Sequence, residues 1–190
     1  METLSNEYLA ILRRIHSKTK WGNTSVRDIN YLPILKIIDR YNVTEMLDYG
    51  AGQGLLKERL NKERPNLLVH EYEPGRPEIS SAPNPANFVV CVDVLEHVEP
   101  DYLDALLDDL ARVVIGTGYL TVSLIPAQKI LPDGRNAHLI IEPFDWWLQK
   151  ISEKFDIRHA SHSSKSASQG QFTVQKKLTR EEFYRQWEKP

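Results

Sequence analysis

The segment most informative about the fold of this chain is Met46-Leu47-Asp48-Tyr49-Gly50-Ala51-Gly52-Gln53-Gly54. The apolar residues before the glycines predict a short strand over 45–49, and those after them predict a helix over 55–64. Glycines at alternate positions let the backbone turn sharply and come close to a ligand. The start of the following helix offers N–H groups to an anionic partner. We therefore predict a strand–turn–helix unit that binds a ligand; the alternative is a tight turn that binds nothing.

The spacing of the glycines separates this turn from a dinucleotide-binding fingerprint. That fingerprint reads G-x-G-x-x-G, and the position of its third glycine is occupied here by Leu55. The pattern present is D-x-G-x-G-x-G. A nicotinamide-dependent oxidoreductase is therefore the least favoured of the enzyme classes considered.

Outward from the turn, strand and helix patterns alternate. Strands are predicted over 67–72, 88–92 and 119–125, with helices over 102–114 and 144–155. Two further strands, over 156–160 and 172–176, suggest a terminal hairpin, and Thr179 with Glu182 suggests a capping box opening a last helix. The expected fold class is α/β, a three-layer α/β/α sandwich on a mostly parallel, doubly wound sheet with a C-terminal antiparallel hairpin.

The length supports one compact domain. Residues 1–41 carry two helical patterns and are expected to form an N-terminal helical cap, with Pro33 tolerated only in the first turn of the second helix. Residues 42–190 are expected to form a single compact unit.

Composition points to a cytoplasmic protein. The 190 residues are 41% hydrophobic and 26% charged, Cys91 is the one cysteine, and no apolar run is long enough for a bilayer. The net charge of −2 gives no field for nucleic acid, although residues 149–190 hold 9 Lys/Arg against 5 Asp/Glu. A basic end of this size is more often a solvated face than a binding surface. Nucleic acid is thus disfavoured as a partner but stays an open alternative, no membrane partner is expected, and the oligomeric state is left open.

Three motifs together carry a resemblance. They are the glycine turn, Tyr72-Glu73-Pro74 after the next strand, and Asp93-Val94-Leu95-Glu96-His97 after a buried strand. This set resembles the class I S-adenosylmethionine-dependent methyltransferases. The loop over 131–138 and the Trp146-Trp147 pair also look like small bacterial and phage members of unassigned substrate. The resemblance implies that residues 42–190 are a methyltransferase domain.

The resemblance also implies a cofactor and the residues that hold it. The cofactor is S-adenosylmethionine, whose amino-acid end would lie over the turn and whose ribose hydroxyls would bond to an acid after the second strand. Glu73 is favoured for that acid over Glu71. The implied cofactor-binding residues are Asp48, Gly50, Ala51, Gly52, Gly54, Glu73, Asp93 and Leu95.

The sequence defines the residues around the methyl acceptor less sharply than those around the cofactor. Methyl transfer needs an in-line approach and often a base for the acceptor proton. His97 is one candidate because imidazole titrates near neutral pH; the alternative is a local capping role. Asp133 and His138, in a polar loop after the fifth strand, form the preferred acceptor-side pair. No metal site is expected, because His138 and Glu142 alone are too few ligands.

One segment departs from the family pattern. Only 14 residues separate Glu73 from Phe88, too few for the usual helix, strand and helix. The third strand region is therefore predicted to be shortened to an irregular connection, and recognition of the adenine ring is placed in doubt.

Three functions follow from these motifs. The first is methylation of a small-molecule or sugar-like acceptor, favoured by the acidic body. The second is methylation of RNA or protein, supported only by the basic end of the chain. The third is a non-catalytic scaffold with a methyltransferase fold, favoured by the shortened segment and opposed by the intact turn. Fold alone does not decide among them.

Overall fold

The computed structural model describes residues 2–18, 22, 24–162 and 168–187. Its six-stranded sheet has the order β2-β1-β3-β4-β6-β5. The strands are β1 (Glu45–Tyr49), β2 (Leu68–Tyr72), β3 (Ala86–Val92), β4 (Val114–Ser123), β5 (Phe155–His162) and β6 (Gln169–Lys176). The first four run parallel, and β6 runs antiparallel to both β4 and β5. The predicted doubly wound sheet with a C-terminal hairpin is confirmed.

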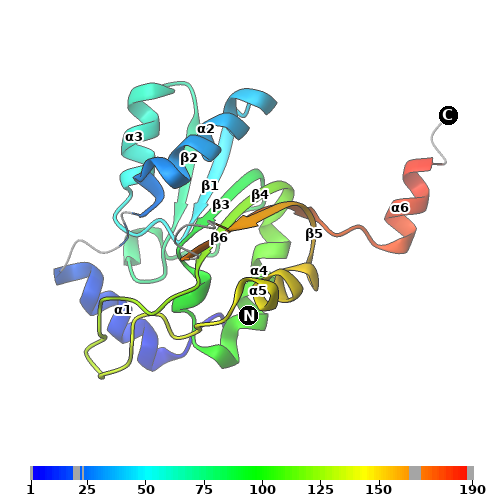
Figure 1. Cartoon of the computed structure of the whole chain (residues 1–190). Coiled ribbons are helices and arrows are strands. Elements are labelled where there is room, and N and C mark those ends of the chain that lie inside the picture. Colours follow the sequence, from blue (N-terminus) through cyan, green and yellow to red (C-terminus); the bar gives the residue numbers. More distant parts are fainter. Residues whose placement is uncertain (1, 19–21, 23, 163–167, 188–190) are drawn as a thin grey trace.

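Helices cover both faces of the sheet (Figure 1). They are α1 (Asn6–Lys18), α2 (Asp28–Tyr41), α3 (Leu55–Glu63), α4 (Leu103–Val113), α5 (Phe144–Ser152) and α6 (Arg180–Trp187), with single 3₁₀ turns η1 (Thr24–Val26), η2 (Pro77–Ile79), η3 (Leu95–His97) and η4 (Pro100–Tyr102). Helices α2 and α3 lie on one face and α4 and α5 on the other, whereas α6 stands apart from the sheet. Among the described helices, none is both long and apolar enough to cross a bilayer.

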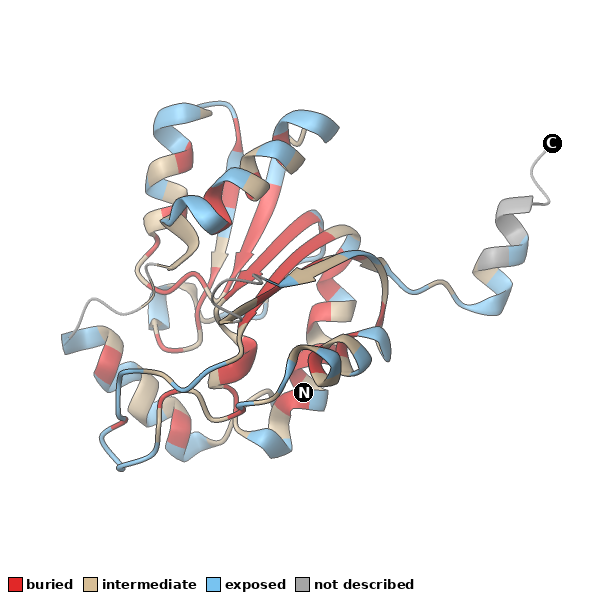
Figure 2. Cartoon of the chain, in the orientation of Figure 1, coloured by how far each residue is buried: buried red, intermediate tan, exposed pale blue. Residues whose placement is uncertain are grey.

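The core divides along the alternation of side chains in the central strands. In β3, Val89 and Cys91 pack in the α4–α5 layer, while Phe88 and Val90 pack in the α2–α3 layer. Successive side chains of a strand point to opposite faces, so a strand that is apolar throughout must be covered on both sides. Figure 2 shows this as a sheet that is buried at its centre.

The predicted loss of the third strand is confirmed. Within the fully described segment between β2 and β3, the chain forms only the turn η2. Strand β2 is therefore an edge of the sheet.

Three predicted boundaries need correction. Helix α5 ends at Ser152, because Phe155 is the buried first residue of β5. Strand β4 begins at Val114, directly after α4, and not near residue 119. Helix α2 begins at Asp28, which places Pro33 beyond its first turn.

Proline at that position removes the N–H that a helix would give to the carbonyl four residues earlier, which is that of Ile29. The side-chain amide of Gln171 donates to this carbonyl at 3.2 Å. A strand at the other end of the chain thereby compensates for the proline. The predicted capping box is confirmed, since Thr179 and Glu182 each bond to the other's backbone N–H.

Candidate functional site

A cavity of about 500 Å³ lies where β1, β2 and β3 end. The chain leaves β1 for β2 on one side and returns to β3 on the other, so this edge is the switch point of the sheet, where ligands of such folds bind. The lining includes the glycine turn, Glu73, Asp93 and His97, together with Leu12 and His16 of α1. Four separate parts of the sequence therefore meet at one cavity.

The glycine turn needs its glycines. Gly50, Gly52 and Gly54 have φ values of 83°, 53° and 77°, in the left-handed region that side chains disfavour. A Cβ atom on Gly50 would also overlap the side chain of Val94. The turn thus brings the backbone against the segment that follows β3.

The N–H groups of the turn are used inside the protein. Those of Gly50 and Ala51 donate to the carbonyl of Tyr72, at 2.8 and 3.0 Å, and that of Gly54 donates to Ala51. The N–H of Gly52 donates to the carboxylate of Glu73 at 3.1 Å. These donors are not available to an anion, so the turn does not match the phosphate cradle of a dinucleotide site.

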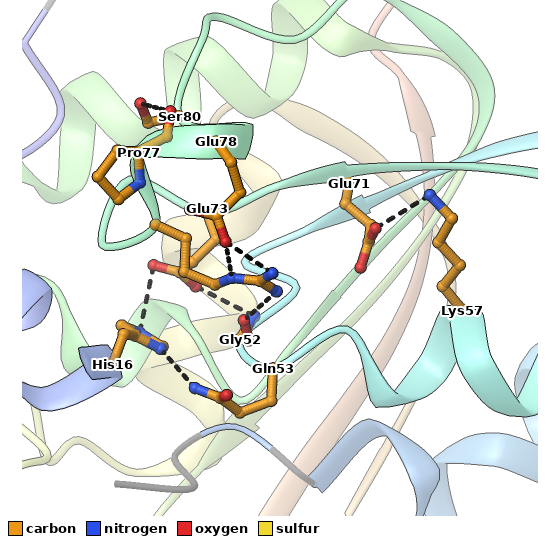
Figure 3. Close-up of polar contacts among 10 residues, drawn as sticks. His16, Gly52, Gln53, Lys57, Glu71, Glu73, Pro77, Glu78 and Ser80 are labelled. Carbon is orange, nitrogen blue, oxygen red and sulfur yellow. Dashed lines mark hydrogen bonds and ion pairs between the residues drawn. The ribbon is translucent and has the colours of Figure 1, made fainter. Parts of the chain in front are cut away.

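The two candidate acids after the turn have different surroundings (Figure 3). Glu73 is buried, lines the cavity, and accepts from the N–H groups of Gly52 and Gly75 at 3.1 and 3.0 Å. Glu71 pairs instead with Lys57 at 3.0 Å and does not appear among the described lining residues. Glu73, and not Glu71, is thus the acid that faces the cavity.

The sequence prediction missed His16. Its Nε2 lies 3.4 Å from Oε1 of Glu73, and its Nδ1 lies 3.2 Å from the amide nitrogen of Gln53 (Figure 3). One neutral tautomer satisfies both contacts, with Nδ1 accepting from Gln53 and Nε2–H donating to Glu73. Burial lowers the pKa of His16, although the Glu73 carboxylate acts in the opposite direction.

Three of the predicted cofactor residues lie behind the cavity lining that the structure describes. Leu95 is fully buried in the α4–α5 layer, and Gly54 caps α3 with its Cα facing Glu71 and Arg76. Asp48 lies beneath the turn with 2% of its surface exposed. Burial, and the charges of Glu71 and Glu73, raise the pKa of Asp48 to about 8.

Asp93 and Glu96 follow β3 as a pair of acids. Asp93 has a φ of 60°, a left-handed conformation that aspartate tolerates better than most residues, and its Oδ2 accepts from the Thr24 hydroxyl at 2.8 Å. Glu96 is fully buried, and its carboxylate accepts from the N–H of Ser123. Burial and the neighbouring Asp93 raise the pKa of Glu96 well above its usual value.

The imidazole rings of His97 and His138 contact each other, and both line the cavity. Nδ1–H of His97 donates to the carbonyl of Ala137 at 2.7 Å, and Nδ1–H of His138 donates to that of Ile125 at 2.6 Å. The rings meet edge to face, with centroids 4.8 Å apart. One potential ligand atom each from Asp93, His97 and His138 lies within 4.8 Å of the others. Burial lowers the pKa of His97.

Asp133 is not brought to His138. Its carboxylate pairs with Arg135 at 2.7 Å, and it is absent from the described cavity lining. Gly134, with a φ of 88°, turns the chain between the two residues of this ion pair. The expected Asp133–His138 pair is therefore not formed, because a neighbour in the same turn holds the aspartate.

The loop after β4 packs on α1. Leu131 and Ala137 of the loop form a small apolar cluster with Tyr8 and Ile15. Asn136 holds the loop together by bonding to both backbone groups of Ala127. Helix α1 and this loop together form one wall of the cavity.

Comparison with known proteins supports the fold alone. No known protein family and no curated protein matches the chain by sequence. Among solved structures, a Burkholderia thailandensis 1,6-didemethyltoxoflavin-N1-methyltransferase is similar at a TM-score of 0.62 and 15% identity, over 90% of each chain. DhpI matches at 0.59 and 14%, over 90% of this chain and 96% of that one. The Bradyrhizobium japonicum N-methyltransferase NodS matches at 0.55 and 12%, over 92% and 100%. The fold is that of the class I methyltransferases.

Proposed function

We propose that the chain binds S-adenosylmethionine in this cavity and methylates a small molecule. The observation that carries the proposal is the position of Glu73, a buried carboxylate that lines the same cavity as the glycine turn. An acid at the end of the second strand is placed to accept hydrogen bonds from ribose hydroxyls in folds of this type. The three similar structures named above were all determined with S-adenosylhomocysteine bound, which supports the same ligand class here.

The residues present fit this cofactor better than a dinucleotide. Each carboxylate oxygen has two lone pairs, and Gly52 and Gly75 each take one on a different oxygen of Glu73. Oε2 therefore keeps capacity for a hydroxyl. The N–H groups of Gly50, Ala51, Gly52 and Gly54 are already bonded within the protein, which suits a ligand without phosphate.

Each part of the site then has a role. Gly50, Ala51 and Gly52 would form the backbone surface under the cofactor, with Glu73 and Asp93 at either side of it. Asp48, Gly54 and Leu95 would act by holding these segments in shape. When bound, the cofactor supplies a sulfonium methyl group, whose carbon bonds to the acceptor's lone pair while the electrons of the broken C–S bond stay on sulfur.

His97 and His138 would act on the acceptor. Both line the cavity, and the Nδ1–H bond of each ring leaves Nε2 as the basic nitrogen. Asp133 is left out of this proposal because Arg135 holds it. A cavity of this volume suits a small acceptor beside the cofactor better than a protein segment, and the Burkholderia thailandensis enzyme was determined with 1,6-didemethyltoxoflavin bound.

Calorimetric titration with S-adenosylmethionine and S-adenosylhomocysteine tests the proposal. We expect micromolar binding by the wild type and no detectable binding by Gly52→Asp, which places a carboxylate in the cavity beside Glu73. Gly134→Asp is the matched control, because Gly134 also has a positive φ and a Cβ atom there meets nothing within 4 Å.

Binding by wild type and Gly134→Asp alone supports the cofactor site and justifies screening acceptors by methyl release. Failure of the folded wild type to bind either compound would overturn the enzyme assignment and favour a scaffold.

A further inference from the structure

Two imidazoles and a carboxylate converge on the acceptor side of the cavity. Asp93 and His97 follow β3, whereas His138 comes from the loop after β4. All three line the cavity, are partly buried, and offer ligand atoms within 4.8 Å of one another. Residues so distant in sequence meet at this point because the carboxyl ends of the parallel strands β3 and β4 share one edge of the sheet.

The surroundings of these three side chains match those of metal ligands. Metal-binding histidines commonly donate their second ring N–H to a backbone carbonyl, which fixes the ring and its tautomer. Both histidines do so here, to Ala137 and Ile125. The Asp93 carboxylate is likewise held, because it accepts a hydrogen bond from the Thr24 hydroxyl at 2.8 Å. The orienting contacts are thus present on every member of the group.

We propose that Asp93, His97 and His138 bind a divalent first-row transition ion. Two nitrogen donors and one oxygen donor suit Mn²⁺, Fe²⁺, Co²⁺ or Zn²⁺ better than Mg²⁺ or Ca²⁺, which prefer oxygen alone. With metal–ligand bonds of about 2.1 Å, donors in a tetrahedral site lie about 3.4 Å apart. The widest separation here is 4.8 Å, so an ion would draw the side chains inward by roughly 1 Å.

Three protein ligands leave coordination positions open toward the cavity. An ion with open positions binds an oxygen and lowers the pKa of that group. The acceptor class that fits is therefore a hydroxyl compound, an alcohol or phenol, whose proton passes to solvent as its oxygen binds the ion. The two histidines then act as ligands and not as the base. This choice of acceptor rests on the proposed function, whereas ion binding rests on the three side chains alone.

Co²⁺ alone is the probe for the site. The chelator-treated full chain is titrated with Co²⁺ and followed by visible absorption and by calorimetry. We expect one Co²⁺ per chain, and an affinity at least about 10-fold lower in His138→Gln and in Asp93→Asn. His159→Gln is the control, because His159 is exposed on β5 and is not part of the cavity lining. Circular dichroism checks that every variant is folded.

The outcomes separate the two proposals. Absence of Co²⁺ binding by the wild type, or wild-type affinity in both ligand variants, overturns the ion site, even where S-adenosylhomocysteine still binds. Co²⁺ binding in the expected pattern supports the site, and if S-adenosylhomocysteine does not bind, the proposed function fails while the ion site stands.

Discussion

Nε2 of His16 lies 3.4 Å from Oε1 of Glu73, and this contact joins the first helix to the end of the second strand. The same imidazole meets Gln53 in the glycine turn. A side chain that is 4% exposed thus connects three segments that are distant in sequence. The wall that α1 adds to the cavity is therefore held by a polar contact as well as by the apolar cluster around Tyr8.

Replacing His16 with Phe tests this contact. The variant keeps a flat ring but leaves Glu73 and Gln53 each without one buried partner, which typically costs about 1–3 kcal/mol. We expect the free energy of unfolding in urea to fall by that amount. His159→Phe, on the exposed part of β5, should leave it nearly unchanged, and equal losses in both variants would contradict the role given to His16.

The assignment of Glu73 over Glu71 predicts different effects of the same substitution. Glu73→Gln removes the charge that faces the cavity and places an amide N–H group toward a backbone donor. Hydrogen bonds to charged groups contribute about 1.5–3 kcal/mol, so affinity for S-adenosylhomocysteine should fall about 10-fold to 100-fold. Glu71→Gln, paired with Lys57 outside the cavity, should bind as the wild type does. Calorimetry compares the two, and the reverse order would refute the assignment.

Asp48 predicts a specific dependence of stability on pH. Its pKa is about 8 in the folded chain and near 4 when unfolded, so the folded state holds a proton that the unfolded state has lost. Between these two pKa values the contribution of Asp48 makes the free energy of unfolding fall as pH rises, by up to about 1.4 kcal/mol per pH unit. Asp48→Asn cannot ionise, so the variant should gain stability relative to the wild type from pH 5 to pH 8.

Urea unfolding at several pH values measures that difference. Asp39→Asn is the control, because Arg64 lowers the pKa of Asp39 and its titration lies below this range. If the free energies of unfolding of Asp48→Asn and the wild type change in parallel from pH 5 to pH 8, Asp48 is not protonated in the folded state and the prediction is wrong.

The tryptophan pair predicts a change in stability without a change in binding. Trp147 is fully buried in the α4–α5 layer, and Trp146 packs against that layer from a partly exposed position. Neither belongs to the cavity lining among the described residues. Trp147→Ala should cost about 3–5 kcal/mol in unfolding experiments, and Trp146→Ala clearly less. Both variants, where folded, should bind S-adenosylhomocysteine normally; a selective loss of binding in Trp146→Ala would place that ring in the site.

The parts of the fold set by local sequence were predictable. Glycines at alternate positions predict a turn from local sequence alone. The number of residues between Glu73 and Phe88 is too small for the usual helix–strand–helix crossover, so its absence was predictable as well. The placement of His16 and the convergence of His138 on Asp93 depend on how α1 and the loop after β4 pack, and no spacing in the sequence encodes that packing. Asp133 lies outside the described cavity lining for a local reason, because Arg135 pairs with its carboxylate within one turn. Pro33 lies beyond the first turn of α2, and the Ile29 carbonyl that it leaves without a helical donor accepts from Gln171 of a remote strand.

The shortened connection between β2 and β3 is a position at which we expect a longer segment to be inserted without disturbing the rest of the sheet. A crossover that adds a strand outside β2 contributes hydrogen bonds along one edge only, so leaving it out does not alter the registers of β1 with β2 and with β3. Strand β2 tolerates its position at the edge because it is short and bears polar side chains that contact neighbouring elements, His70 with Glu45 of β1 and Glu71 with Lys57 of α3. A helix–strand–helix insert between η2 and β3 would extend the sheet outward while the inner strands, on which the cavity is built, keep their pairing.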